Sequence, residues 1–111
     1  MQFLIRFSYT SRSIKALLQR PDLDHAGEAS ALLASLDAKL LGYWYAFDEF
    51  DGVVLIEAAD SSIAAAAAMA VGGSGEVSRL QTTVLLSMDE AHLAMRKAAT
   101  ATHVPRAQEE G

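Results

Sequence analysis

The chain has 111 residues, of which 51% are hydrophobic and 21% are charged, and its formal net charge is −5. A single domain of this size buries roughly 65% of the surface of its unfolded chain, so a hydrophobic core is expected. The acidic balance and the lack of any Lys/Arg cluster disfavour nucleic acid as a partner. Because cysteine is absent, disulfides and thiolate metal sites are excluded.

The start of the chain and its apolar runs carry no membrane signal. Met1 to Arg6 lack the basic segment and long apolar core of a secretory signal. The alanine run at residues 64–68 is far shorter than the roughly 20 residues of a membrane span. We therefore expect a cytoplasmic protein without a membrane partner.

The first elements are a strand and a short helix. Apolar residues alternate over residues 3–9, which is the period of a strand with two unequal faces. The hydroxyl residues at 10–13 are suited to capping a helix over residues 14–19.

Pro21 is expected to separate this helix from the next. Proline lacks a backbone donor and disfavours helical geometry at the residue before it. A second helix should begin at about Asp22, because apolar residues then recur at spacings of three and four as far as Leu40.

The rest of the chain predicts a hairpin, a helix, a strand and a final helix. Tyr43 and Tyr45 should share one face of the hairpin's first strand, with Trp44 on the other. Residues 72–75 (Gly-Gly-Ser-Gly) should end the central helix through a left-handed glycine. The expected ranges are strand 41–47, turn 48–52, strand 53–58, helix 63–71, strand 77–86 and helix 89–98.

The order of these elements predicts an α+β fold. A β-α-β-β-α-β order with alternating strands is typical of a ferredoxin-like sandwich with an antiparallel sheet of order 4-1-3-2. The C-terminal helix is added to this unit. We expect one domain over residues 1–98 and a flexible tail over residues 99–111.

The hairpin resembles the GYD-domain family. Asp48-Glu49-Phe50-Asp51 is similar to the family's Gly-x-Tyr-Asp element, and it is followed by a valine-rich strand and by Glu57-Ala58-Ala59-Asp60. The chain departs from the pattern at Asp48, Phe50 and Ala59, where the family has glycine, tyrosine and proline. The resemblance covers roughly residues 1–91. It implies a ferredoxin-like fold of the dimeric α/β-barrel group and an oligomer, but no activity.

The carboxylates of the hairpin, Asp48, Glu49 and Asp51, are not spaced like a calcium loop. Aspartate and glutamate also suit a tight turn without any ligand. We expect an exposed turn at residues 48–52, with no metal and no cofactor.

Charged residues on the strands suggest a cleft on the sheet face that the helices leave open. Period two can place Glu57 on the same open face as Arg6, with Arg79 and Trp44 nearby. One interpretation is a structural Arg6–Glu57 pair across strands. The other is a ligand cleft in which an arginine holds an anionic or carbonyl group and Glu57 acts as a base.

His25 also has two interpretations. It could line a cleft at the sheet edge, or it could be a solvated helix histidine. His25, His92 and His103 are not spaced like metal ligands.

Apolar residues on the open face predict self-association. Leu4, Val53, Leu55 and Leu85 should lie there beside an aromatic strand, and monomers seldom expose such a patch. The main hypothesis is a small homo-oligomeric domain without assignable catalysis. The alternative is a cofactor-independent enzyme, monooxygenase- or isomerase-like, or a small-ligand-binding module with a cleft on the open face.

Overall fold

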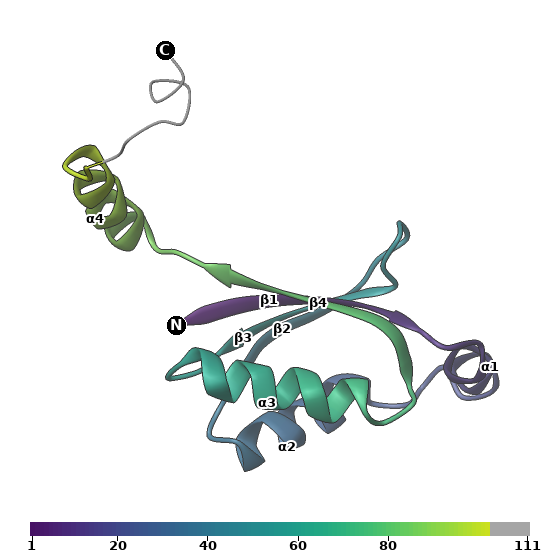
Figure 1. Ribbon diagram of the computed structural model, residues 1–111. Helices are drawn as coiled ribbons and strands as arrows, with labels where there is room; N and C mark the ends of the chain where they lie inside the picture. The colour runs from purple at the N-terminus through teal and green to yellow at the C-terminus, as the bar shows by residue number, and fades with distance from the viewer. Residues whose placement is uncertain (103–111) are drawn as a thin grey trace.

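Four antiparallel strands form one sheet in the order β2-β3-β1-β4 (Figure 1). The computed structural model describes residues 1–102. The order is the predicted 4-1-3-2 order counted from the opposite edge, so the ferredoxin-like prediction is confirmed. The strands are β1 (Gln2–Tyr9), β2 (Lys39–Tyr45), β3 (Gly52–Glu57) and β4 (Val77–Leu85).

Four helices accompany the sheet, and two of them, α2 and α3, lie on the same face (Figure 1). Each helix begins where a side-chain oxygen accepts a backbone N–H of its first turn, as at Thr10, Asp24, Asp60 and Ser87. The helices are α1 (Ser11–Gln19), α2 (His25–Ser35), α3 (Ser61–Gly72) and α4 (Met88–Ala99). None of the helices within residues 1–102 has both the length and the apolarity that crossing a bilayer requires.

The predicted break at Pro21 is confirmed, because α1 and α2 are separate helices. The second helix begins at His25 rather than at about Asp22, and it ends at Ser35, so that Leu40 lies in β2 and not on the helix. The Asp24 carboxylate accepts the N–H of Gly27 at 2.9 Å, which fixes the first turn at His25.

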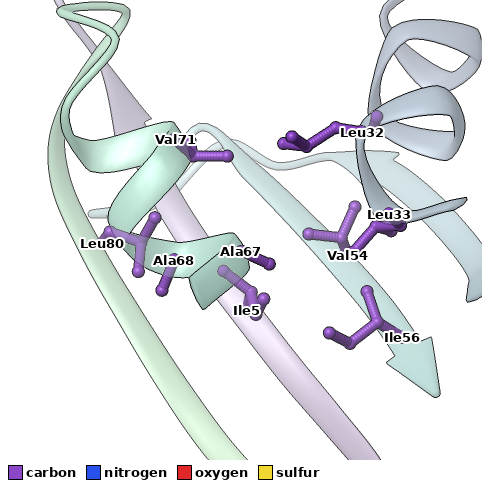
Figure 2. Close-up of a pocket in the computed structure, with 10 residues that line it drawn as sticks. Ile5, Leu32, Leu33, Val54, Ile56, Ala67, Ala68, Val71 and Leu80 are labelled. Atoms are coloured by element: carbon purple, nitrogen blue, oxygen red, sulfur yellow. The ribbon is translucent and has the colours of Figure 1, made fainter. Parts of the chain in front are cut away.

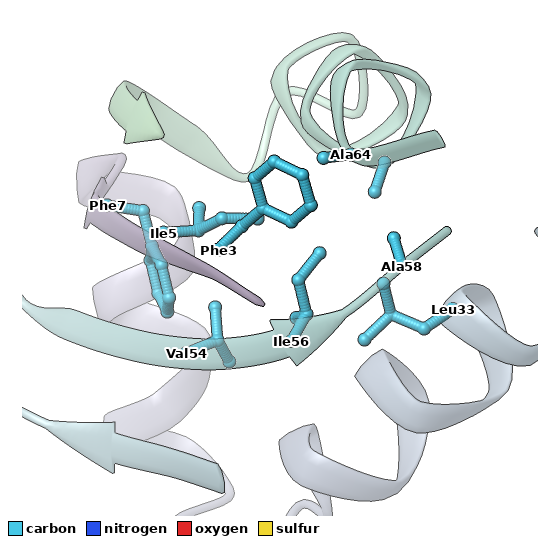
Figure 3. Packing of buried hydrophobic residues seen from close by; sticks show 9 residues of the cluster. Phe3, Ile5, Phe7, Leu33, Val54, Ile56, Ala58 and Ala64 are labelled. Carbon is cyan, nitrogen blue, oxygen red and sulfur yellow. The ribbon is translucent and has the colours of Figure 1, made fainter. Parts of the chain in front are cut away.

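The core lies between the sheet and the pair α2 and α3 (Figure 3). Alternate residues of β1 point into it, and Phe3 and Ile56 are each only 1% exposed. Alanines of α3 let this helix approach the sheet closely. The buried members are Phe3, Ile5, Phe7, Leu33, Val54, Ile56, Ala58, Ala64 and Ala67.

No helix of residues 1–102 lies on the other face of the sheet (Figure 1). The strand register places Leu4 opposite Leu55 and Leu85 opposite Gln2, as expected for the open face. Helix α4 does not cover this face, and it stands beyond the end of β4 (Figure 1). Its Met88 and Met95 are 73% and 64% exposed.

Further local predictions were wrong. Strand β2 covers Lys39–Tyr45 rather than residues 41–47. Helix α3 extends through Gly72, and the left-handed residue is Gly75, with φ of 80°, rather than a glycine directly after the helix. The hairpin turn is not fully exposed, because Phe50 is only 4% exposed. The predicted tail reaches residues 103–111, which lie outside the described residues.

Candidate functional site

A concave site with both apolar and polar lining residues lies between the sheet and the helices α2 and α3. It has a volume of about 320 Å³, at the lower end of the range for small-molecule sites. We call it the sheet–helix cleft. It is lined by His25, Glu28, Ala29, Leu32, Tyr43, Val54, Ala70, Val71, Ser74 and Glu76.

The floor of the cleft is apolar and continues into a smaller cavity of about 70 Å³ (Figure 2). The two spaces share Ala29, Leu32, Val54 and Val71. Figure 2 shows Leu32 and Val71 pointing toward one another from the two helices. A ligand would therefore bury apolar surface between the helices, which favours binding in proportion to the area removed from water.

A pair of phenols lies at the polar end of the cleft. The hydroxyl groups of Tyr9 and Tyr43 are 2.7 Å apart and hydrogen-bonded. Tyr43 lines the cleft, and Tyr9 lies behind it in edge contact with Phe7. One phenol can donate to its partner while the partner donates to a ligand, so the pair can hold and polarise a ligand oxygen.

Burial raises the pKa of Tyr9 above that of a free phenol, and its hydrogen bond with Tyr43 raises it further. Burial also raises the pKa of Tyr43, although its hydrogen bond with Tyr9 opposes this shift. Both phenols are therefore neutral near pH 7 and retain protons that they can donate.

The ring of His25 lies near that of Tyr9, with 6.2 Å between the ring centroids. Its Nε2 atom is buried and has no hydrogen-bond partner within residues 1–102. A buried polar atom without a partner is uncommon in native proteins and directs attention to the space beside it. Since His25 also lines the cleft, the ligand-facing interpretation of this residue is favoured over the solvated one.

Irregularities in two strands place these groups. The pairing of β2 with β3 shifts between Leu40 and Gly42, which sets Tyr43 opposite the buried Val54. The pairing of β1 with β4 shifts between Ser8 and Tyr9. Each shift adjusts the direction of a side chain at the strand end, as β-bulges do near binding sites.

The charged residues of the cleft are both acidic: Glu28 on α2 and Glu76 before β4. Both are exposed, and both act to raise the pKa of Tyr43. Their field disfavours a ligand anion and tolerates a neutral or cationic one.

The residues that the sequence suggested for an open-face cleft form a different cluster. The guanidinium carbons of Arg6 and Arg79 lie 4.7 Å and 4.6 Å from the centre of the Phe50 ring. We call these three residues the guanidinium clamp. Arg6 also donates to Gln81 at 2.6 Å, and Arg79 pairs with Glu49 at 3.5 Å.

Glu57 and Trp44 are not part of this clamp. Glu57 lies opposite Gln2, four positions along β1 from Arg6, and the Arg6–Glu57 ion pair is not formed. Trp44 lies opposite Val53 on the neighbouring strand and is 54% exposed. The structure therefore brings Arg6 and Arg79 together and leaves Glu57 without a guanidinium partner in residues 1–102.

The aspartates of the hairpin motif accept hydrogen bonds from backbone N–H groups of the chain. Asp48 accepts the N–H of Phe50 at 2.7 Å, as in a turn. Asp51 accepts the N–H of Tyr9 at 2.8 Å. In the described part of the chain, no group of three or more histidine and carboxylate side chains could hold a metal ion.

Sequence reasoning missed Tyr9 and Tyr43 as site residues. Their signal was available, because both occupy helix-facing positions that the strand period otherwise fills with apolar residues. A phenol at such a position needs a partner for its hydroxyl.

Comparisons with known proteins support this fold. No curated protein matches the sequence. Among solved structures, the chain is similar to 5-chloro-2-hydroxyhydroquinone dehydrochlorinase from Burkholderia phenoliruptrix AC1100, solved in complex with 2,5-dihydroxybenzoquinone. The TM-score is 0.53 and the identity 13%, over 80% of this chain and 97% of the other.

The family comparison is more specific. The GYD domain model matches residues 3–95, which includes all four strands, the helices α1 to α3 and the hairpin motif. The chain belongs to the GYD domain family.

Proposed function

We propose that this protein is a homo-oligomeric domain that binds a small, largely apolar, neutral or cationic molecule in the sheet–helix cleft. The observation that carries the proposal is the combination of an apolar floor with hydrogen-bonding groups at one end, Tyr43 and His25. Pockets that bind small molecules share this design of apolar walls and few polar groups. The proposal moves the expected ligand site from the open face of the sheet to the helix face.

The choice of probe follows from the shape and charge of the cleft. The dehydrochlorinase of similar fold was solved with a six-membered-ring compound, which motivates a ring-containing probe. Benzyl alcohol, benzylamine and benzoate share one ring and differ in charge. Benzyl alcohol should bind with a dissociation constant on the order of 1 mM, as expected for about eight heavy atoms. Benzoate should bind more weakly than the other two.

The binding test uses two alanines of α3. Ala70 lines the cleft and is exposed, so Ala70→Trp should block the site without disturbing the core. Ala65 is exposed on the same helix and does not line the cleft, so Ala65→Trp is the matched control. NMR titration should show benzyl alcohol binding to the control and not to Ala70→Trp. Equal binding by both variants would contradict the proposal.

A second candidate is proton-transfer catalysis in the same cleft. It is favoured by the Tyr9–Tyr43 hydrogen bond near the ring of His25, whose Nε2 atom has no hydrogen-bond partner among residues 1–102. Together these groups offer an acid and a base. Acetophenone in D₂O would then exchange its methyl protons for deuterons faster with the protein than without it. Tyr43→Phe should abolish the acceleration, and an uncatalysed rate would leave binding as the function.

The homo-oligomer is proposed to form through the open face of the sheet. Leu4, Val53, Leu55 and Leu85 are each only partly buried there. Trp44 adds an indole that is 54% exposed on the same face. A second copy of the chain would cover this surface while leaving the sheet–helix cleft accessible on the opposite side.

A further inference from the structure

We propose that Asp51, the aspartate of the hairpin motif, is a positioning residue that sets the Tyr9–Tyr43 pair in the sheet–helix cleft. The part that the Tyr9–Tyr43 pair plays in ligand binding rests on the proposed function. The positioning itself is a statement about geometry and can be tested without a ligand.

Asp51 joins three segments through short hydrogen bonds. Its carboxylate accepts the N–H of Tyr9 at 2.8 Å, and its own N–H donates to the carbonyl of Phe7 at 2.8 Å. Its carbonyl accepts the N–H of Ala46 at 2.8 Å, just after β2. Asp51 thus ties the end of β1 to the end of β2, the two strands that carry Tyr9 and Tyr43.

The bond to Tyr9 lies at the point where β1 leaves its regular pairing. The register with β4 shifts between Ser8 and Tyr9, and the register with β3 ends at Phe7. Strand pairing therefore constrains the backbone of Tyr9 less than that of the residues before it. The Asp51 carboxylate supplies the missing constraint, and a charged acceptor makes a stronger bond than a neutral one.

A neighbouring hydrogen bond also holds the end of β1. Ser8 donates its hydroxyl to the carbonyl of Glu49 at 2.9 Å, so two successive residues of β1 are held by the hairpin. Phe50, between Glu49 and Asp51, is held by the guanidinium clamp on the open face. The hairpin thus holds the end of β1 by hydrogen bonds. Phe50 lies on one face of the sheet, and the hydrogen bond between the hydroxyls of Tyr9 and Tyr43 lies on the other.

The phenyl ring of Phe50 is consistent with this division of roles. It stands where the family has tyrosine, and the hydrogen bond with the Tyr9 N–H is made by Asp51, which this chain keeps. The absence of a hydroxyl at position 50 therefore leaves the hydrogen bond between Asp51 and the Tyr9 N–H unchanged.

The test compares two aspartates of one turn. Asp51→Ala removes the acceptor for the Tyr9 N–H, and Asp48→Ala removes the acceptor for the Phe50 N–H in the same hairpin. We expect the ring signals of Tyr43 in NMR spectra to shift in Asp51→Ala and to keep their positions in Asp48→Ala. Asp51→Asn retains an acceptor oxygen and should restore them. Unchanged Tyr43 signals in Asp51→Ala, or equal shifts in both alanine variants, would overturn the proposal.

If Asp51→Ala does not fold, the test uses the variants Asp51→Asn and Asp48→Asn instead. Asp51→Asn removes the charge of the acceptor and so weakens its hydrogen bond with the Tyr9 N–H. The Tyr9 amide proton should therefore exchange with solvent faster in Asp51→Asn, and Asp48→Asn should leave its exchange rate unchanged. An unchanged exchange rate in Asp51→Asn would show that the carboxylate does not hold Tyr9 and would overturn the proposal.

Discussion

At the scale of single residues, the site depends on polar groups in positions that favour apolar ones. Tyr9 and Tyr43 each place a hydroxyl beside the core, and each satisfies it with the other. Such a pair is stable while both phenols keep their protons, because an unpaired charge in a half-buried position is costly. This hydrogen-bonded pair therefore makes the fold sensitive to alkaline pH.

The two tyrosines should make the protein less stable above about pH 10, the ordinary pKa of tyrosine. Their pKa values are raised in the folded state, so the unfolded chain loses protons first. Stability is then fully present below about pH 10 and falls as the pH rises through the folded pKa values. The limiting slope is about 1.4 kcal/mol per pH unit for each proton, and solvent screening of these half-buried groups reduces it.

Urea unfolding across this pH range measures the effect. The double variant Tyr9→Phe with Tyr43→Phe serves as the control, because it lacks both phenols and keeps every other side chain. The loss of unfolding free energy at high pH should be smaller in the double variant. Parallel profiles for the two proteins would contradict the role given to this pair.

At the scale of elements, most of the fold could be predicted from local patterns. The alternation of β1 assigned the core face to Phe3, Ile5 and Phe7, and the cap residues marked the helix starts within a few positions. These features depend on neighbours in sequence. The burial of Phe50 could not be predicted in this way, because it depends on Arg6 and Arg79, which are distant in sequence.

The candidate site was harder to predict for the same reason. The sequence placed Arg6 and Glu57 on one face, but the register separates them by four positions along β1. The cleft combines His25, Tyr43 and Glu76 from three segments, and strand shifts set the direction of its tyrosines. Periodicity alone does not report such shifts.

Substitutions of two glycines by alanine test how closely individual elements pack. A Cβ on Gly52 in β3 would overlap the ring of Phe7, which is buried on the adjacent strand. Gly52→Ala should therefore lower the free energy of unfolding by about 1–3 kcal/mol, as overpacking does. Thermal and urea unfolding measure this loss.

Gly72 in the last turn of α3 is the matched control. A Cβ there would meet nothing within 4 Å. Gly72→Ala should raise stability by roughly 0.5–1 kcal/mol, because alanine favours the helix and restricts the unfolded chain. Equal effects of the two substitutions would be inconsistent with the close packing of Phe7 on β3.

At the scale of the whole molecule, the two faces of the sheet have different roles. The helix face encloses the core and the cleft, and the open face carries partly buried apolar side chains. Helix α4 adds Leu93 and Met95, 49% and 64% exposed, at a distance from its own sheet (Figure 1). Such surfaces are typical of chains that associate.

Light scattering at micromolar concentration should give the mass of a dimer or a larger assembly. A standard interface buries about 800 Å² on each partner. Leu55→Asp on the open face should dissociate the assembly and leave the helix content unchanged. Glu57→Asp, at an exposed position that keeps its charge, is a control that should remain associated. The mass of one chain for the unmutated protein would contradict the argument from the open face.

The most direct test of the central claim is the location of the bound probe. Intermolecular nuclear Overhauser effects from benzyl alcohol to the methyl groups of the protein distinguish the two faces of the sheet. We predict contacts to Leu32, Val54 and Val71, which line the sheet–helix cleft. Contacts to Leu4 and Leu55 instead would place the ligand on the open face and contradict the account.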